Sequence, residues 1–285
     1  MDPARIRLRR ILGRLPWWSA TFGLVVAAAL WVYPFVWTVS ASLKSSFEVF
    51  GSGLNLVPAS IEWSNYERAW VDAGFNRYLL NTVIVSLCTV VIVVVRCALA
   101  GYVLGRCRFR GSRTISAVLV ATLFVPTGYT IIPVMDLSMR LGLLNSLSGL
   151  VIALSGTANV AAILLYAGYF RQLPVELEEA ATIDGAGFVR VFVSVMMPLA
   201  LPVTATVALL AFLGSWNAFF LPLVFTFSRP GLRTLSVGMQ AFVGENAIDW
   251  SGMAAASVIS LLPVVVLFMF LQRYFAEGIA GAVKS

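Results

Sequence analysis

The chain has 285 residues, of which 60% are hydrophobic and 12% charged, and its formal net charge at pH 7 is +7. Soluble domains usually contain roughly 45–50% apolar and about 25% charged residues, so this composition excludes an ordinary soluble domain. Histidine is absent, which removes the usual general base and metal ligand and argues against an enzyme. The cysteines Cys88, Cys97 and Cys107 have neither metal-ligand spacing nor the pattern of a disulfide framework.

Six apolar windows are long enough to cross a bilayer, because a spanning helix needs about 20 residues. They cover residues 18–40, 79–104, 114–135, 149–170, 200–225 and 253–274. The prediction is therefore an all-α, polytopic membrane protein with six transmembrane helices, in which residues 18–285 form a single transmembrane domain. Residues 1–17 form a basic arm before the first span, and residues 275–285 form a tail after the last.

The positions of the basic residues predict the orientation in the membrane, because Lys and Arg accumulate in short cytoplasmic segments. With the N-terminus inside, the cytoplasmic set is Arg5, Arg7, Arg9, Arg10, Arg14, Arg106, Arg108, Arg110, Arg113, Arg171, Arg190, Arg273 and Lys284. The smaller external set is Lys44, Arg68, Arg77, Arg140, Arg229 and Arg233. Both termini and residues 171–198 are thus predicted to be cytoplasmic. The net positive charge reflects membrane orientation rather than nucleic-acid binding.

Arg96 is the one basic residue in the interior of a predicted span, since Arg273 lies at the very end of the last window. A charge there costs at least about 2.5 kcal/mol on insertion scales, so the side chain should face protein or water. None of the six windows has a central Asp or Glu to pair with it. Two interpretations stay open: the side chain extends toward the interface, or it lines a polar pathway or meets a carboxylate of a partner subunit.

A polar segment, residues 171–198, separates the fourth and fifth windows. Glu176, Glu178 and Glu179 follow Pro174 within one turn, where acids favour the positive end of a helix dipole. Residues 184–187, Asp-Gly-Ala-Gly, have the chemistry of a turn that ends a helix, and a second helix is expected after them. A helix-turn-helix at the membrane surface suits docking to another protein. An ordinary amphipathic interfacial loop is the alternative.

Within this segment, Glu179-Ala180-Ala181 is followed after three residues by Gly185 and after nine more by Val-Met-Met-Pro at 195–198. This pattern resembles the EAA loop of ABC importer permeases, EAA-x3-G-x9-I-x-L-P, with Val and Met replacing Ile and Leu. The resemblance implies a cytoplasmic coupling loop over 171–198 that contacts a separate ATPase. The coupling residues it implies are Glu179, Ala180, Ala181, Asp184 and Gly185.

Three further segments resemble carbohydrate permeases of the maltose type: Asn65-Tyr66, the Trp216-Asn217 pair before Pro222, and the glycine-bearing residues 272–284. The resemblance makes Trp216 and Asn217, together with Arg96, candidates for the substrate pathway. A Trp ring could stack on a pyranose and an Asn could bond its hydroxyls. The alternatives are an Asn that bridges two helices and aromatic side chains that anchor the chain at the interface.

The resemblance implies a transmembrane subunit of an ATP-driven importer in the plasma membrane of a prokaryote, which moves a carbohydrate by alternating access. The chain contains no Walker A sequence, so ATP and Mg would be bound by a separate ATPase subunit. The implied partners are an ABC ATPase dimer, a second permease in a heterodimer, an extracytoplasmic solute-binding protein, the sugar and membrane lipid, with no nucleic acid. This chain itself would bind no cofactor or metal and would contain no catalytic residue.

Two alternatives stay open. A permease for a non-sugar solute, such as a glycerol phosphodiester, would carry the same EAA loop, and Arg96 would suit an anionic substrate. A secondary transporter would normally need acids or histidines inside the membrane, and the windows lack both.

Overall fold

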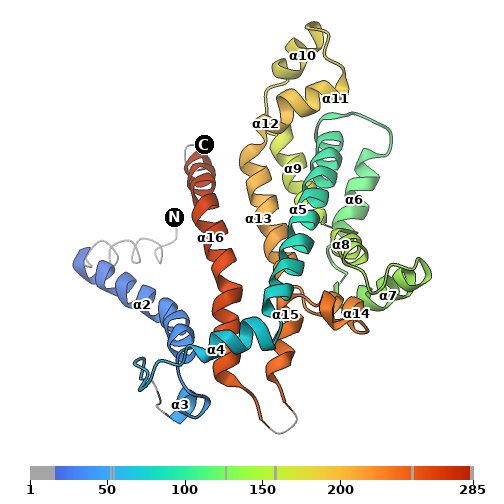
Figure 1. Cartoon of the computed structure of the whole chain (residues 1–285). Helices are drawn as coiled ribbons and strands as arrows, with labels where there is room; N and C mark the ends of the chain where they lie inside the picture. The colour runs from blue at the N-terminus through green and yellow to red at the C-terminus, as the bar shows by residue number, and fades with distance from the viewer. Residues whose placement is uncertain are drawn as a thin grey trace. The chain divides into compact units, whose positions relative to one another are not determined.

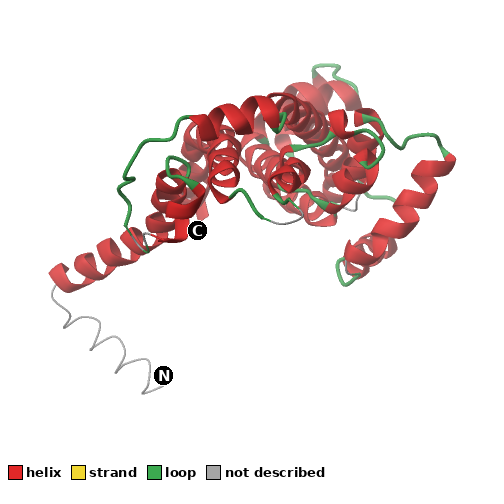
Figure 2. Cartoon of the chain, turned by 60° about the horizontal axis from the view of Figure 1, so that its bottom comes forward, coloured by secondary structure: helices red, strands yellow, loops and turns green. Residues whose placement is uncertain are grey.

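The computed structural model describes residues 17–51, 53, 55–125, 127–156, 159–244 and 247–282. The predicted basic arm lies outside these residues except for the backbone of Trp17, as does Lys284 of the tail. Every described element is a helix, apart from one isolated bridge between Val243 and Ile248. Figure 2 shows helices and loops in the described chain and no strand. The all-α prediction is confirmed.

The chain divides into two compact units, residues 1–72 with 242–259 and residues 73–241 with 260–285 (Figure 1). The first unit contains α2 (Trp17–Ala41), α3 (Ser46–Gly51), α4 (Ser64–Glu67), the π-helix η1 (Arg68–Asp72) and the start of α16 (Trp250–Ala282). The second contains α5 (Phe75–Arg106), α6 (Ser112–Thr122), α7 (Ile131–Arg140), α8 (Leu147–Gly156), α9 (Val160–Gln172), α10 (Glu176–Ile183), α11 (Phe188–Val191), α12 (Met197–Leu199), α13 (Leu201–Trp216), α14 (Phe220–Thr226) and α15 (Leu235–Gly238). Short 3-10 and π turns, η2 (Thr127–Thr130), η3 (Phe192–Met196), η4 (Pro230–Leu232) and η5 (Met239–Phe242), connect them.

Three helices in the described residues are long and apolar enough to cross a membrane: Trp18–Ala41, Phe75–Arg106 and Trp250–Phe270. Two bent pairs could each form a further span, which gives up to five. One pair is α8 with α9. The other joins residues 188–199 to α13 across a bend of 81°. The chain therefore contains the apolar helices of a polytopic membrane protein.

The third predicted window, 114–135, is not a single helix in the structure. α6 ends at Thr122, and α7 begins at Ile131 after the 3-10 turn. Pro133 lies in the first turn of α7, where the missing N–H leaves no intrahelical hydrogen bond unmade. The fifth window, 200–225, is also divided, because α13 ends at Trp216 and α14 starts at Phe220. Hydropathy counts apolar residues, so it does not register these breaks.

The core of the second unit forms where α5 packs on α9. Gly101 and Gly105 of α5 lie so close to α9 that an added Cβ would be 2.4 Å from the Cβ of Tyr166 and 2.8 Å from the carbonyl oxygen of Ala167, respectively. Small residues four apart let two helix backbones approach in this way. The Tyr166 hydroxyl also donates to Thr204 Oγ1 at 2.9 Å, which connects α9 to α13. α5, α9 and α13 therefore form one packed group of helices.

Candidate functional site

The polar segment 171–198 contains two short helices, α10 and α11, with a tight turn between them (Figure 1). The N–H of Ala186 donates to the carbonyl of Ala181 at 2.9 Å, and the N–H of Gly185 donates to that of Thr182 at 3.0 Å. This pair of bonds is a Schellman motif, which needs a left-handed residue after the helix. Gly185 is that residue, with φ of +82°. Glycine adopts this conformation without the Cβ clash that other residues meet.

The candidate coupling residues share this helix and its turn. Glu179, Ala180, Asp184 and Gly185 are exposed, whereas Ala181 is half-buried against the core of its unit. Large apolar side chains are exposed beside them, with Ile183 at 86% of its full accessibility. Phe188 and Val189 of α11 are exposed as well. This surface combines acids with unburied apolar area, a composition that suits contact with another protein.

The base of α10 is held by an ion pair that the sequence reasoning missed. Arg106, the last residue of α5, donates from Nε to Glu178 Oε1 at 2.7 Å. The same guanidinium donates from Nη1 to the carbonyl of Leu173 at 2.9 Å and from Nη2 to that of Pro174 at 3.4 Å. Glu178 was visible in the sequence as a first-turn acid, but its partner is 72 residues away in the chain.

A cysteine follows this arginine. Burial raises the pKa of the Cys107 thiol above its ordinary value, and the negative charge of Glu178 raises it further. The thiol is therefore held in its neutral, unreactive form at neutral pH. In the described part of the chain, no group of three or more His, Cys, Asp or Glu side chains could hold a metal ion.

The three candidate pathway residues lie on two helices. Arg96 is half-buried on α5. Trp216, at the end of α13, is only 4% exposed and stacks on Phe212 of the same helix, with ring centroids 5.0 Å apart. Asn217 is exposed and donates from Nδ2 to the carbonyl of Leu213 at 3.0 Å. The tryptophan thus packs within its own chain, and the asparagine caps its own helix.

A cavity of about 480 Å³ lies among α5, α9 and α13, which the sequence reasoning did not identify. Its polar lining comes from Thr89, Asn159 and Ser215, and the rest is mostly aliphatic. The Thr89 hydroxyl is buried and has no hydrogen-bond partner in the structure. The cavity therefore offers a hydroxyl-bearing surface among otherwise apolar helices.

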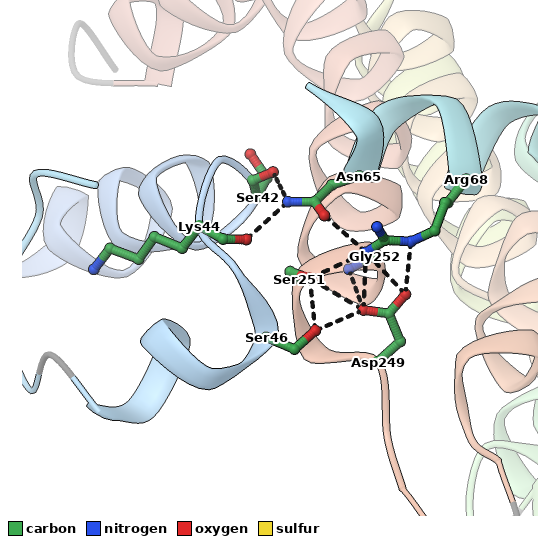
Figure 3. A network of polar contacts seen from close by, with 8 residues as sticks. All are labelled: Ser42, Lys44, Ser46, Asn65, Arg68, Asp249, Ser251 and Gly252. Atoms are coloured by element: carbon green, nitrogen blue, oxygen red, sulfur yellow. Dashed lines mark hydrogen bonds and ion pairs between the residues drawn. The ribbon is translucent and has the colours of Figure 1, made fainter. Parts of the chain in front are cut away.

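In the first unit, Asn65 belongs to a polar network rather than to an open surface (Figure 3). Its Nδ2 donates to the carbonyls of Ser42 and Lys44, each at 2.9 Å. Its Oδ1 accepts from Arg68 Nη2 at 2.7 Å, and Arg68 Nε in turn donates to Asp249 Oδ2 at 3.3 Å. Asn65 is buried and joins three segments of its unit, so its observed contacts are structural.

Asp249 is both the ion-pair partner of Arg68 and the cap of α16. Its Oδ1 accepts from the N–H of Gly252 at 2.9 Å, which is the bond that an N-cap side chain makes to the third helical residue. Burial by itself would raise the pKa of Asp249. The Gly252 N–H and the Arg68 charge outweigh burial, with help from Ser251 and Ser46, and hold the pKa below its usual range. The carboxylate is thus ionised and fixed in place (Figure 3).

These features define a class, a helical protein with several apolar helices suited to crossing a membrane. Residues 97–281 match the family model described as "Binding-protein-dependent transport system inner membrane component". The match covers more than half of the chain, so the chain belongs to this family. The family supplies the membrane component of the transport system rather than an enzyme.

Individual relatives agree with this assignment. The chain is 34% identical over 259 residues to the diacetylchitobiose uptake system permease protein of Streptomyces coelicolor, covering 90% of this chain and 85% of that one. It is 31% identical over 287 residues to the melibiose/raffinose/stachyose import permease protein of Bacillus subtilis, covering 100% of both. The fold matches a chain in the crystal structure of "a bacterial ABC transporter involved in the import of the acidic polysaccharide alginate", with a TM-score of 0.80 and 27% identity over 94% of this chain and 98% of that one. The predicted resemblance to ABC importer permeases of the carbohydrate type is confirmed.

Proposed function

We propose that this chain is one of two transmembrane subunits of an ATP-driven importer that moves a carbohydrate across the plasma membrane of a prokaryote. Membership of the binding-protein-dependent family supports the importer, and relatives named for oligosaccharides support the substrate class. The proposed arrangement has six spans, both termini and residues 171–198 in the cytoplasm, and no catalytic site in this chain. ATP and Mg would be bound by a separate ATPase dimer.

The observation that carries this proposal is the exposed surface of α10 and its turn. An exposed cluster of large apolar side chains on a folded chain usually marks a surface that a partner covers. Ile183 and Val189 are such side chains, and Glu179 and Asp184 are exposed beside them. We assign this surface to the ATPase, with Glu179, Ala180, Ala181, Asp184 and Gly185 as the coupling residues.

The route from this surface toward the membrane supports alternating access as the mechanism. α11 continues through η3 and α12 to a bend of 81°, after which α13 begins. Because α13 packs with α5 and α9 around the cavity at Thr89, a displacement of α10 and α11 would change the walls of that cavity. ATP binding would favour one of two arrangements and hydrolysis the other, since the ATPase contacts the two differently.

For the pathway itself, Arg96, Trp216 and Asn217 stay proposed residues. Asn217 is exposed and could exchange its bond to Leu213 for one to a solute hydroxyl. Trp216 is covered by its own chain, so it would support the residues that line the pathway rather than contact the solute. Arg96 favours a second candidate substrate, an anionic solute such as a glycerol phosphodiester, because a half-buried guanidinium can pair with a phosphate.

The test compares two glycines of the same turn in proteoliposomes that contain the chain with its co-purifying subunits. An added Cβ meets no atom within 4 Å at Gly185 or at Gly187, but φ is +82° at Gly185 and −73° at Gly187. Gly185→Ala should therefore strain the turn by about 1–2 kcal/mol, whereas Gly187→Ala should not. We expect solute-stimulated ATP hydrolysis and uptake to fall only in Gly185→Ala.

The substrate class is tested in the same vesicles with a panel of oligosaccharides and glycerol phosphodiesters. Uptake of an oligosaccharide supports a carbohydrate as the substrate. Uptake of a glycerol phosphodiester alone would favour the anionic solute instead. Failure of any ATPase to co-purify, or equal activity of the two glycine variants, would contradict the docking surface.

A further inference from the structure

One guanidinium joins three elements of the second unit. Arg106 is the last residue of α5, Glu178 lies in the first turn of α10, and Leu173 directly follows α9. The Nε–Oε1 distance of 2.7 Å and the Nη1–O distance of 2.9 Å are those of good charge-assisted hydrogen bonds. The planar fork of arginine fixes the directions of both bonds at once, which a lysine could not do.

The partly buried surroundings of this ion pair oppose the separation of its two charges. The side chain of Arg106 is 11% exposed and that of Glu178 is 20% exposed. Ion pairs between fully exposed side chains contribute little, because water screens them and both chains lose rotamer freedom. A pair shielded to this degree interacts through a lower local dielectric, so separating the two charges is opposed more strongly.

Beyond the contacts of Glu178, α10 has few attachments to the packed helices. Before it, Leu173 has an extended backbone, and after it the chain turns at Gly185. Among the eight residues of α10, Ala181 alone packs against the core of the unit. Glu178 also interacts with the Tyr102 hydroxyl of α5. The ion pair and this contact are therefore the main side-chain connections between α10 and the packed helices.

We propose that Arg106, through its bonds to Glu178 and to the end of α9, is the positioning residue that transmits movement of α10 into α5. The inference rests on the proposed function, because it takes α10 to be the element that the ATPase moves. α5 can pass this movement on to α9, since Gly101 and Gly105 place the two helices in backbone contact. A displacement of α10 that reaches α5 through Arg106 would therefore move α5 and α9 together rather than only the adjoining loop.

The test measures solute molecules transported per ATP hydrolysed by the complete transporter in proteoliposomes, together with recovery of the assembled complex by gel filtration. Glu178→Gln and Arg106→Gln each remove one charge of the pair. Glu176→Gln is the matched control, because Glu176 is an exposed acid in the same turn. We expect both pair variants to assemble and hydrolyse ATP, with transport per ATP reduced about fivefold or more, and the control to match wild type.

The exchanged double variant, Arg106→Glu with Glu178→Arg, should recover part of the lost transport per ATP hydrolysed. It restores the opposite charges but not the bonds from the guanidinium to the carbonyls at the end of α9. An unchanged ratio in Glu178→Gln would overturn the inference. So would loss of assembly in both single variants, since the pair would then serve stability alone. If wild type itself couples no uptake to ATP hydrolysis, the proposed function fails instead, and the two failures are thereby separated.

Discussion

Replacing Gly101 by alanine tests how closely α5 and α9 pack. A Cβ at this position would lie 2.4 Å from the Cβ of Tyr166, 2.9 Å from the carbonyl oxygen of Ile163 and 3.0 Å from the backbone nitrogen of Ala167. Carbon atoms in ordinary contact are about 3.5–4.0 Å apart, so the helices would have to separate by roughly 1 Å. A change of rotamer cannot relieve this contact, because all three atoms are backbone atoms or a Cβ.

The expected cost follows from two opposing effects. Overpacking a core usually costs about 1–3 kcal/mol, and the rigid neighbours at Gly101 place it in the upper half of that range. Replacing a helical glycine by alanine also gains about 0.5–1 kcal/mol through backbone entropy. Gly101→Ala should therefore lower the free energy of unfolding by about 1–2.5 kcal/mol.

Gly168→Ala is the matched control, because Gly168 lies on α9 and an added Cβ there meets no atom within 4 Å. It should stabilise the chain by about 0.5–1 kcal/mol. The measurement is the free energy of unfolding by SDS titration in mixed micelles, followed by far-UV circular dichroism. If Gly101→Ala is as stable as Gly168→Ala, the close approach of the two backbones is wrong.

Three further predictions concern polar groups. Asp249 has a lowered pKa, so its contribution to stability is present above its unfolded pKa of about 3.9 and is lost as the pH falls through the folded value. Hydrogen-exchange protection factors at residues 64–72, corrected for the intrinsic exchange rate at each pH, should fall in acid in wild type, and Asp249→Asn should remove this pH dependence. Asn65→Ala should lower the free energy of unfolding by about 1–3 kcal/mol, because it leaves the carbonyls of Ser42 and Lys44 without their donor. We expect faster hydrogen exchange with unchanged solute affinity. Unchanged hydrogen exchange with weaker solute affinity would instead indicate a binding role for Asn65. Cys107 should be alkylated faster at a given pH in Glu178→Gln than in wild type, because the variant removes a negative charge that raises the thiol pKa. The alkylation rates are measured in a background without Cys88 and Cys97. Equal rates there would contradict the electrostatic contribution of Glu178.

Local chemistry indicates several features of the structure directly. The apolar windows indicated the helical class, and the Asp184-Gly185 dipeptide occurs at the end of α10, where the backbone turns left-handed. Such features depend on residues close together in the chain. The small-residue pattern of Gly101 and Gly105 was also present in the sequence, and it would have predicted the close contact of α5 with another helix.

Other features depend on partners that local patterns do not specify. The ion pair of Arg106 with Glu178 joins residues 72 apart, and neither side chain alone indicates the other. The breaks after Thr122 and Trp216 fall within windows whose average hydropathy is that of a continuous span, so the average does not reveal them. Trp216 is instructive because its stacking partner, Phe212, is four residues earlier in the same helix. That spacing favours an intrahelical contact, and it was available as a reason to place the ring in the protein interior.

The bend before α13 has a mechanical consequence. Residues 188–199 span roughly 18 Å at about 1.5 Å per residue, and they meet α13 at 81° through Ala200, which is fully buried. This geometry is that of a lever with its fulcrum in the core. A rotation of about 10° at the fulcrum moves the far end by roughly 3 Å, as hinge motions do. Ångström-scale displacements at the exposed turn therefore correspond to small rotations among the packed helices, which those helices can accommodate without losing their contacts.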